Sequence, residues 1–278
     1  MKADFNQASI GQVKRALRDA LGPLPEINWP LDKSWAVIRA RVVNPENEDI
    51  SLPSTFGAPP PIETSQGRAN LVNFPVFYGT FDARNAMQEL DVDVGTECYV
   101  SIWGFEKETP IATTFLSGAA EKNDLARLQG KLPEMPLEQL KGGYTKSSLA
   151  KGMELRASAF TQGNYELTSK IAHDIIYNRS ALSDALIYPG VKDPYRCNIA
   201  LNPDFVNANM HCVRVYKMVW SGAFIFRMLA RATNDNGKLD WQPTGSFELD
   251  EVDRKYSGSN GPSDIHPSAL EVLKDSSS

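Results

Sequence analysis

The sequence has little of the chemistry on which disulfide scaffolds and metal centres depend. Its 278 residues include three cysteines, Cys98, Cys197 and Cys212, and three histidines. Three scattered thiols do not make a disulfide framework, so we expect the reduced thiols of a cytoplasmic protein. No cluster of cysteine and histidine has the spacing of zinc ligands, which argues against a metal site.

The chain also lacks a surplus of positive charge and a long apolar run. Lys and Arg number 29 against 34 Asp and Glu, which gives a formal net charge of −5. A nucleic-acid-binding protein normally shows a basic excess, so we expect no direct nucleic-acid partner. The most apolar stretch, 213–232, is interrupted by Arg214, Lys217 and Arg227, and no stretch reaches the ~18 residues of a membrane span. The first residues lack the basic and apolar regions of a signal peptide, which again favours the cytoplasm.

Several common catalytic motifs are absent as well. There is no Walker loop, no GxGxxG after a strand, no GxSxG and no HExxH. This argues against a conventional dinucleotide-binding dehydrogenase and against a serine hydrolase. What is present is an ordinary globular composition, 42% hydrophobic and 23% charged, in a chain long enough for one large or two smaller domains.

The first predicted element is an amphipathic helix over 9–21. Apolar residues recur at helical spacing, and Ser9 with Gln12 three residues later forms a capping pattern. Such a helix either packs on the main domain or binds a partner.

The next elements place the charged residues of interest. Alternation over 35–43 predicts a strand with Arg39 and Arg41 on one face, which is either a solvated edge or an anion pocket. A second strand is predicted over 74–81. Asp82 then caps a helix in which Glu89 lies beside the apolar stripe.

The remaining pattern predicts a mixed α+β fold, because helices and short strands do not alternate regularly. His173, on a predicted helix over 164–178, is expected to be a plain surface residue. The segment 44–74 is a long loop, and 117–163 has short helices near 120–129 and 135–141 with no assigned role. Further strands are predicted over 98–105, 185–188, 198–201, 212–220 and 224–233.

Several ordered segments together resemble the RES domain family. They correspond to the family's opening Arg-x-Arg, its GaPP and GRaN motifs, its PvlY strand, its helix with a glutamate, and its YpS and Nlal segments. In this sequence they are Ile38-Arg39-Ala40-Arg41, Gly57-Ala58-Pro59-Pro60, Gly67-Arg68-Ala69-Asn70, Phe74-Pro75-Val76-Phe77-Tyr78, Asn85-Ala86-Met87-Gln88-Glu89, Leu186-Ile187-Tyr188-Pro189-Gly190 and Asn198-Ile199-Ala200-Leu201.

This resemblance implies a fold similar to ADP-ribosyltransferases, with two small mixed or antiparallel sheets flanking an NAD cleft and with peripheral helices. The expected organisation is a helical extension over 1–33, a RES-like catalytic domain over 34–247 with 117–163 as an insert, and a polar flexible tail over 248–278.

The resemblance also implies a function. The family's characterised bacterial members are toxins that degrade NAD by hydrolysis or phosphorolysis of the nicotinamide–ribose bond and are neutralised by an Xre-type helix-turn-helix antitoxin. Arg39 and Arg68, with Arg41 as a weaker candidate, would bind the pyrophosphate through bidentate guanidinium contacts. Tyr78 would stack on nicotinamide. The carboxylate of Glu89 would stabilise the oxocarbenium-like transition state.

The catalytic candidates are therefore Glu89, Arg39 and Tyr78. The NAD-binding candidates are Arg39, Arg41, Arg68, Tyr78 and Asn198, and no metal is expected.

One position departs from the family pattern. The family's serine falls on Gly190, which has no hydroxyl, and Ser183 is a possible substitute. The departure keeps a second hypothesis open, a non-catalytic RES-like protein that binds a nucleotide or a partner. A third is transfer of ADP-ribose to a macromolecule.

Overall fold

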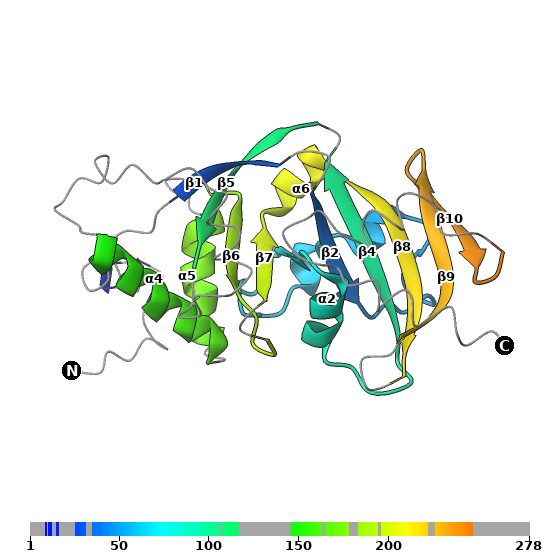
Figure 1. Ribbon diagram of the computed structural model, residues 1–278, viewed down its shortest axis with the longest axis horizontal. Helices are drawn as coiled ribbons and strands as arrows, with labels where there is room; N and C mark the ends of the chain where they lie inside the picture. Colours follow the sequence, from blue (N-terminus) through cyan, green and yellow to red (C-terminus); the bar gives the residue numbers. More distant parts are fainter. Residues whose placement is uncertain are drawn as a thin grey trace. The chain divides into compact units, whose positions relative to one another are not determined.

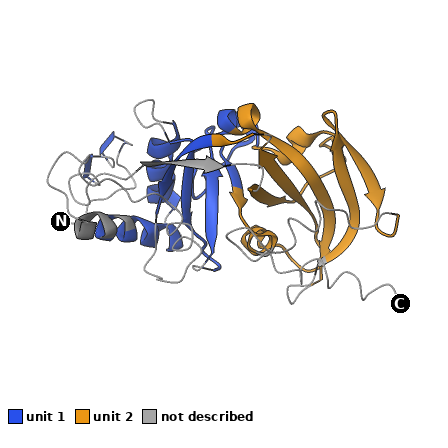
Figure 2. Ribbon diagram, turned by 45° about the horizontal axis from the view of Figure 1, so that its top comes forward, with its two compact units in different colours: residues 1–30, 59–78, 110–205 blue, residues 31–58, 79–109, 206–278 orange. Residues whose placement is uncertain are grey.

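The chain forms two compact units, which are coloured separately in Figure 2. The first comprises 1–30, 59–78 and 110–205, and the second comprises 31–58, 79–109 and 206–278. The chain passes between them at 30/31, 58/59, 78/79, 109/110 and 205/206, so that strand β3 (Phe77–Thr80) and helix α6 (Pro203–Asn209) each contribute to both units. The computed structural model describes residues 9, 11–12, 15–16, 26–31, 35–105, 107–116, 146–162, 165–177, 183–193, 196–221 and 226–246.

Unit 1 combines a mixed set of strands with two long helices (Figure 1). Its strand order is β1-β5-β6-β7-β3, with β5 parallel to β6 and β6 antiparallel to β7. A short 3₁₀ turn, η2 (Pro61–Glu63), lies in its loop. The other elements are β1 (Glu26–Leu31), β5 (Thr109–Phe115), α4 (Lys146–Thr161), α5 (Tyr165–Tyr177), β6 (Ala185–Pro189) and β7 (Cys197–Leu201).

The core of unit 1 lies between β6, β7 and the two helices. α5 buries Ile171, Ile175 and Ile176, the positions that recur at helical spacing in the sequence. They pack in one cluster with Phe160 of α4 and Tyr188 of β6. This cluster fixes the sheet face on which the GRaN segment rests.

Unit 2 is built on antiparallel strands in the order β3-β2-β4-β8-β9-β10. One 3₁₀ turn, η1 (Pro53–Phe56), and one helix, α2 (Ala83–Leu90), belong to it. The strands are β2 (Ala36–Arg41), β4 (Glu97–Phe105), β8 (Met210–Trp220), β9 (Phe226–Asp235) and β10 (Lys238–Pro243).

α2 covers one face of β2 and β4 because its apolar residues repeat every three to four positions. Ala86 and Met87 of the helix join Ile38 and Val100 in a buried cluster. The opposite face of β4 carries Tyr99, whose ring contacts Phe56 of η1 at a centroid distance of 5.5 Å. The two faces of the sheet therefore bury different segments of the chain.

The mixed α+β class is confirmed, but two separate small sheets are not shown, because β3 belongs to both strand orders. The capping pattern of the first predicted helix is present: Ser9 N–H donates to Gln12 Oε1 over 2.8 Å, and Gln12 N–H donates to Ser9 Oγ over 3.3 Å. Strands β1, β5 and β10 and helices α4 and α6 were not expected. The predicted helices at 120–129 and 135–141 and the tail after 247 lie outside the described residues.

Candidate functional site

The Gly67–Asn70 segment of unit 1 forms a tight turn closed by its own backbone. Gly67 N–H donates to the carbonyl oxygen of Asn70 over 3.1 Å. The side-chain amide of Asn70 donates to the carbonyl oxygens of Ser65 (2.7 Å) and Leu71 (3.0 Å), and Asn70 is 4% exposed. The turn is thus anchored on both sides of the residue that it presents, Arg68.

Tyr78 of β3 locks this turn through its hydroxyl group. The hydroxyl donates to Asn70 Oδ1 and accepts from the backbone N–H of Ala69, each over 2.7 Å. A Cβ atom at Gly67 would lie 2.4 Å from Asn70 Oδ1 and 2.7 Å from the Tyr78 hydroxyl oxygen. The glycine is therefore required by close approach. The Tyr78 hydroxyl has a structural task beyond the ring stacking implied by the resemblance.

Arg68 extends from this turn to an aromatic ring of β6. Its Cζ atom lies 5.8 Å from the centroid of the Tyr188 ring, within the range of a cation–π contact. Asn198 of β7 is the register partner of Tyr188, so the two side chains stand on the same face of the sheet. Asn198 is 5% exposed. Unit 1 therefore brings three of the predicted NAD-binding residues, Arg68, Tyr78 and Asn198, to one face of its core.

The position of the missing family serine lies at the end of β6. Gly190 is buried and donates its N–H to the carbonyl oxygen of Arg196 over 2.9 Å. Ser183 precedes the same strand, and its hydroxyl lies 2.9 Å from that of Thr114 on β5. The five residues of β6 separate the two positions by roughly 17 Å at about 3.3 Å per residue. Ser183 therefore does not substitute for a hydroxyl at 190.

In unit 2 the predicted alternation of β2 is confirmed. Arg39 and Arg41 pair in register with Ser101 and Tyr99 of β4, so both arginines stand on one face of the strand. The carbonyl oxygen of Arg39 accepts a hydrogen bond from Ser101 Oγ over 3.2 Å.

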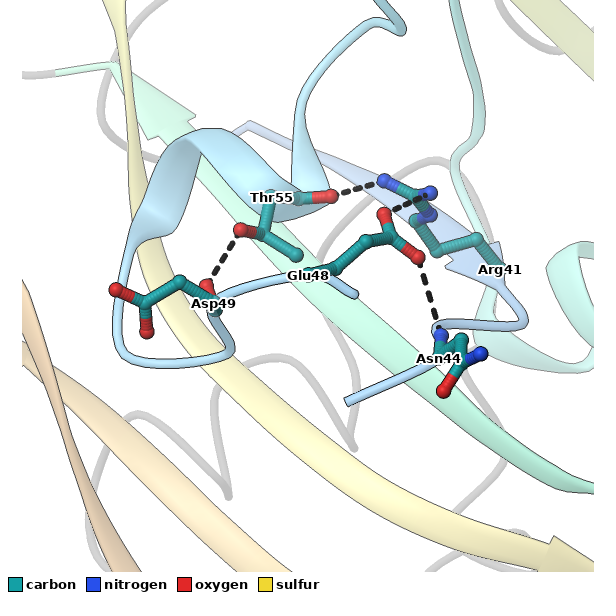
Figure 3. A network of polar contacts seen from close by, with 5 residues as sticks. All are labelled: Arg41, Asn44, Glu48, Asp49 and Thr55. Atoms are coloured by element: carbon teal, nitrogen blue, oxygen red, sulfur yellow. Dashed lines mark hydrogen bonds and ion pairs between the residues drawn. The ribbon is translucent and has the colours of Figure 1, made fainter. Parts of the chain in front are cut away.

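Arg41 holds the loop that follows β2 (Figure 3). Its guanidinium donates to Glu48 Oε1 over 2.6 Å and to the carbonyl oxygen of Thr55. The other carboxylate oxygen of Glu48 accepts the backbone N–H of Asn44 over 3.0 Å. Arg41 thus has a structural role within its unit, and its role in binding NAD remains a prediction.

Glu89 lies on a face of α2 that is polar but partly buried, unlike a face open to solvent. Asp82 caps α2, since Asn85 N–H donates to its Oδ1 over 3.4 Å. Asn85, one turn before Glu89, is 1% exposed, and Glu89 itself is half-buried. α2 packs on the Ile38 face of β2, and Arg39 points to the other face. Unit 2 therefore does not bring Arg39 and Glu89 together on one face of that strand.

The structure places further residues beside the turn and on α2. The sequence had assigned no role to them. Asn70, Asn85 and Tyr188 all lie within the matched motifs, so their presence there was the available signal. Nothing in the sequence pattern indicated that Glu48 would bind Arg41, because the two residues meet only through the way the loop folds back in three dimensions.

His173 is not the surface residue that was expected. Its ring packs between Phe74 (centroid distance 4.5 Å) and Tyr177 (5.3 Å), and burial lowers its pKa. Burial also raises the pKa of the Tyr177 phenol to about 12, and its hydroxyl donates to the carbonyl oxygen of Pro75. These rings fasten α5 to the segment that leads into β3.

Cys98, Cys197 and Cys212 form no disulfide, and all three are buried. Burial raises the pKa of Cys98 and of Cys212 to about 12, so neither is a thiolate at neutral pH. Within the described part of the chain no group of His, Cys, Asp or Glu is arranged to hold a metal ion. None of the described helices combines the length and apolar character needed to cross a membrane.

The fold and these clusters define a mixed α+β protein with an arginine turn in one unit and a carboxylate-bearing helix in the other. A family model of the RES domain matches residues 39–221, which is more than half of the 278 residues. The chain belongs to the RES domain family. A search of curated proteins finds no match.

Proposed function

We propose that this RES-domain protein cleaves NAD⁺ at the bond between nicotinamide and ribose. In hydrolysis the C–N bond breaks, nicotinamide leaves as a neutral molecule with the bonding electron pair, and water adds to the ribose carbon with loss of a proton. In phosphorolysis inorganic phosphate takes the place of water. Either route builds positive charge on the ribose carbon in the transition state.

The proposal gives each candidate a separate task. Arg68 binds diphosphate oxygens, and the Tyr78 ring contacts nicotinamide. A role for Arg39 stays a prediction, because Arg39 and α2 lie on opposite faces of β2. Glu89 stabilises the ribose cation as it forms, because a fixed carboxylate is worth most where charge develops.

The observation that carries the proposal is the turn at Gly67–Asn70. The Tyr78 hydroxyl and the Asn70 side chain are both bonded to the turn, over 2.7 Å in each contact with Tyr78. An ordinary surface loop is held by fewer side-chain hydrogen bonds than those that surround the half-buried Arg68. Preorganisation of this kind is typical of residues that bind a charged substrate.

The test is nicotinamide release from NAD⁺ by the purified protein, with and without phosphate. Glu89→Gln keeps the shape of the side chain and removes its charge, and we expect a loss of roughly 10²–10³-fold in kcat. Glu154→Gln, at an exposed position of α4, is the matched control and should leave the rate unchanged. If the wild type released nicotinamide no faster than Glu89→Gln, the proposal that the protein cleaves NAD⁺ with the help of Glu89 would be excluded.

A second function is favoured by Gly190, which cannot supply the family's hydroxyl, and by Ser183, which is bonded to Thr114 at the other end of β6. A RES-like protein of this kind would bind a nucleotide without cleaving it. NAD⁺ binding by calorimetry without nicotinamide release would support it. Labelled ADP-ribose that remains on a macromolecule would instead support transfer.

The proposal includes an Xre-type helix-turn-helix antitoxin as partner. If a helix-turn-helix protein is encoded beside this one, its addition should suppress nicotinamide release. Unchanged turnover in the presence of a stoichiometric complex would contradict neutralisation.

A further inference from the structure

The guanidinium of Arg68 is held at its far end by an aromatic ring. An arginine side chain carries about 2 kcal/mol of rotamer entropy, so a guanidinium that binds a substrate gains from being oriented beforehand. Arg68 Cζ lies 5.8 Å from the centroid of the Tyr188 ring. A cation–π contact uses the face of the guanidinium rather than its N–H groups, so it orients the group without competing for hydrogen bonds.

The ring itself is fixed and cannot follow the arginine. Tyr188 is 1% exposed and lies on β6, which is paired on one side with β5 and on the other with β7. The Phe160 ring of α4 contacts the Tyr188 ring at a centroid distance of 4.8 Å and an angle of 41°. Tyr188 is therefore a rigid platform rather than a mobile cover.

The near end of the Arg68 side chain is held as well. Its backbone belongs to the turn that the Tyr78 hydroxyl closes onto Ala69 and Asn70. With the backbone fixed by the turn and the guanidinium by the ring, few of the side-chain rotamers remain.

We propose that Tyr188 is a positioning residue, which acts through Arg68 and orients its guanidinium toward the diphosphate of the substrate. This inference rests on the proposed function. It adds that Tyr188 contributes to the affinity of the site for the diphosphate of NAD⁺. Because the ring provides the contact, Phe at this position should serve and an aliphatic residue should not. The Tyr188 hydroxyl has no part in the proposed task.

The kinetic experiment compares Tyr188→Phe, Tyr188→Leu and Phe115→Leu in the full chain. Phe115 is a buried ring of β5 in register with Ile187, so it faces the side of the sheet opposite to Tyr188 and controls for loss of a core ring. We expect Tyr188→Leu to raise the KM for NAD⁺ about tenfold, equal to about 1.4 kcal/mol, with kcat within about threefold. Tyr188→Phe and Phe115→Leu should stay within about twofold of the wild type in KM.

With nicotinamide riboside, which has no phosphate, Tyr188→Leu should behave as the wild type. An equal rise in KM for both substrates, or for Phe115→Leu and Tyr188→Leu alike, would show a general loss of packing and overturn the proposal.

A spectroscopic readout tests the contact without activity. The Arg68 Hε resonance, assigned by its disappearance in Arg68→Lys, should be displaced by the ring current of Tyr188 in the wild type and in Tyr188→Phe. A random-coil position in the wild type would overturn the proposal, even if Tyr188→Leu failed to fold. If the wild type released no nicotinamide, the proposed function would be contradicted but the contact would not, because the position of the Arg68 Hε resonance still decides whether Tyr188 orients Arg68.

Discussion

Replacing Gly67 by alanine tests the packing of the turn most sharply. The added methyl carbon would lie 2.4 Å from Asn70 Oδ1 and 2.7 Å from the Tyr78 hydroxyl oxygen, both well inside van der Waals contact. Asn70 cannot retreat easily, because its amide is bonded to the carbonyl oxygens of Ser65 and Leu71 over 2.7 and 3.0 Å. The Tyr78 hydroxyl must therefore leave Asn70 and the Ala69 N–H.

Two hydrogen bonds at about 1 kcal/mol each, with one partly buried acceptor left unpaired, amount to a loss of about 2–3 kcal/mol in the free energy of unfolding. Urea titration measures it. Gly57→Ala is the control, because its Cβ would meet no atom closer than the Ser54 carbonyl oxygen at 3.1 Å, with a Trp103 ring carbon at 3.8 Å and the Ser54 carbonyl carbon at 3.9 Å. We expect that variant to lose less than about 1 kcal/mol. Gly67→Ala with the stability of the wild type would refute the reasoning about the turn.

Three further outcomes follow from the same contacts. Tyr78→Phe keeps the ring but loses both 2.7 Å hydrogen bonds, so it should lower stability by about 1–2 kcal/mol and raise the KM for NAD⁺; an unchanged KM would disconnect the hydroxyl from Arg68. Arg41→Ala removes the contacts to Glu48 and Thr55, so hydrogen exchange in 44–55 should accelerate while NAD⁺ cleavage stays within about threefold; a larger loss would show that Arg41 binds the substrate. Burial lowers the pKa of His173 below its usual 6.5, so the unfolded state binds the proton more readily than the folded state. The free energy of unfolding should therefore be at its full value above pH 6.5 and should fall as the pH drops below it. Urea titrations between pH 5 and 8 should show this dependence in the wild type and not in His173→Phe.

The sequence predicted the elements whose cores follow a simple period. The capped helix α2 and the isoleucine face of α5 appear where the pattern placed them, because large apolar side chains mark their buried faces. The alternation that puts Arg39 and Arg41 on one face of β2 holds for the same reason.

The missed elements carry a weaker pattern of large apolar side chains, or one that polar residues interrupt. The buried residues of α4 include Gly152, Arg156 and Ala157, and only Phe160 among its described buried positions is large and apolar. β5 buries Thr113 and Thr114 beside Ile111 and Phe115, so polar residues interrupt its apolar pattern, and it pairs in parallel with β6, a partner distant in the sequence. β1 contains Pro30, which reads as a loop. In each case tertiary contacts decide the structure.

The candidate site shows the same division. The matched motifs identified Arg68, Tyr78 and Asn198, which unit 1 holds on one face of its core. They did not reveal that the Tyr78 hydroxyl closes the turn or that the Tyr188 ring lies beside the Arg68 guanidinium, because both contacts depend on the tertiary course of the loop before β3. The ion pair of Arg41 with Glu48 was not predicted because it depends on the course of the loop that follows β2.

Nicotinamide release from NAD⁺ by the purified protein tests the central claim most directly, with the kinetics of two single variants beside it. We predict release by the wild type, a raised KM with Arg68→Lys, which loses the bidentate guanidinium, and a lowered kcat with Glu89→Gln. A wild-type protein that releases no nicotinamide, or two variants that match it in both constants, would contradict the account.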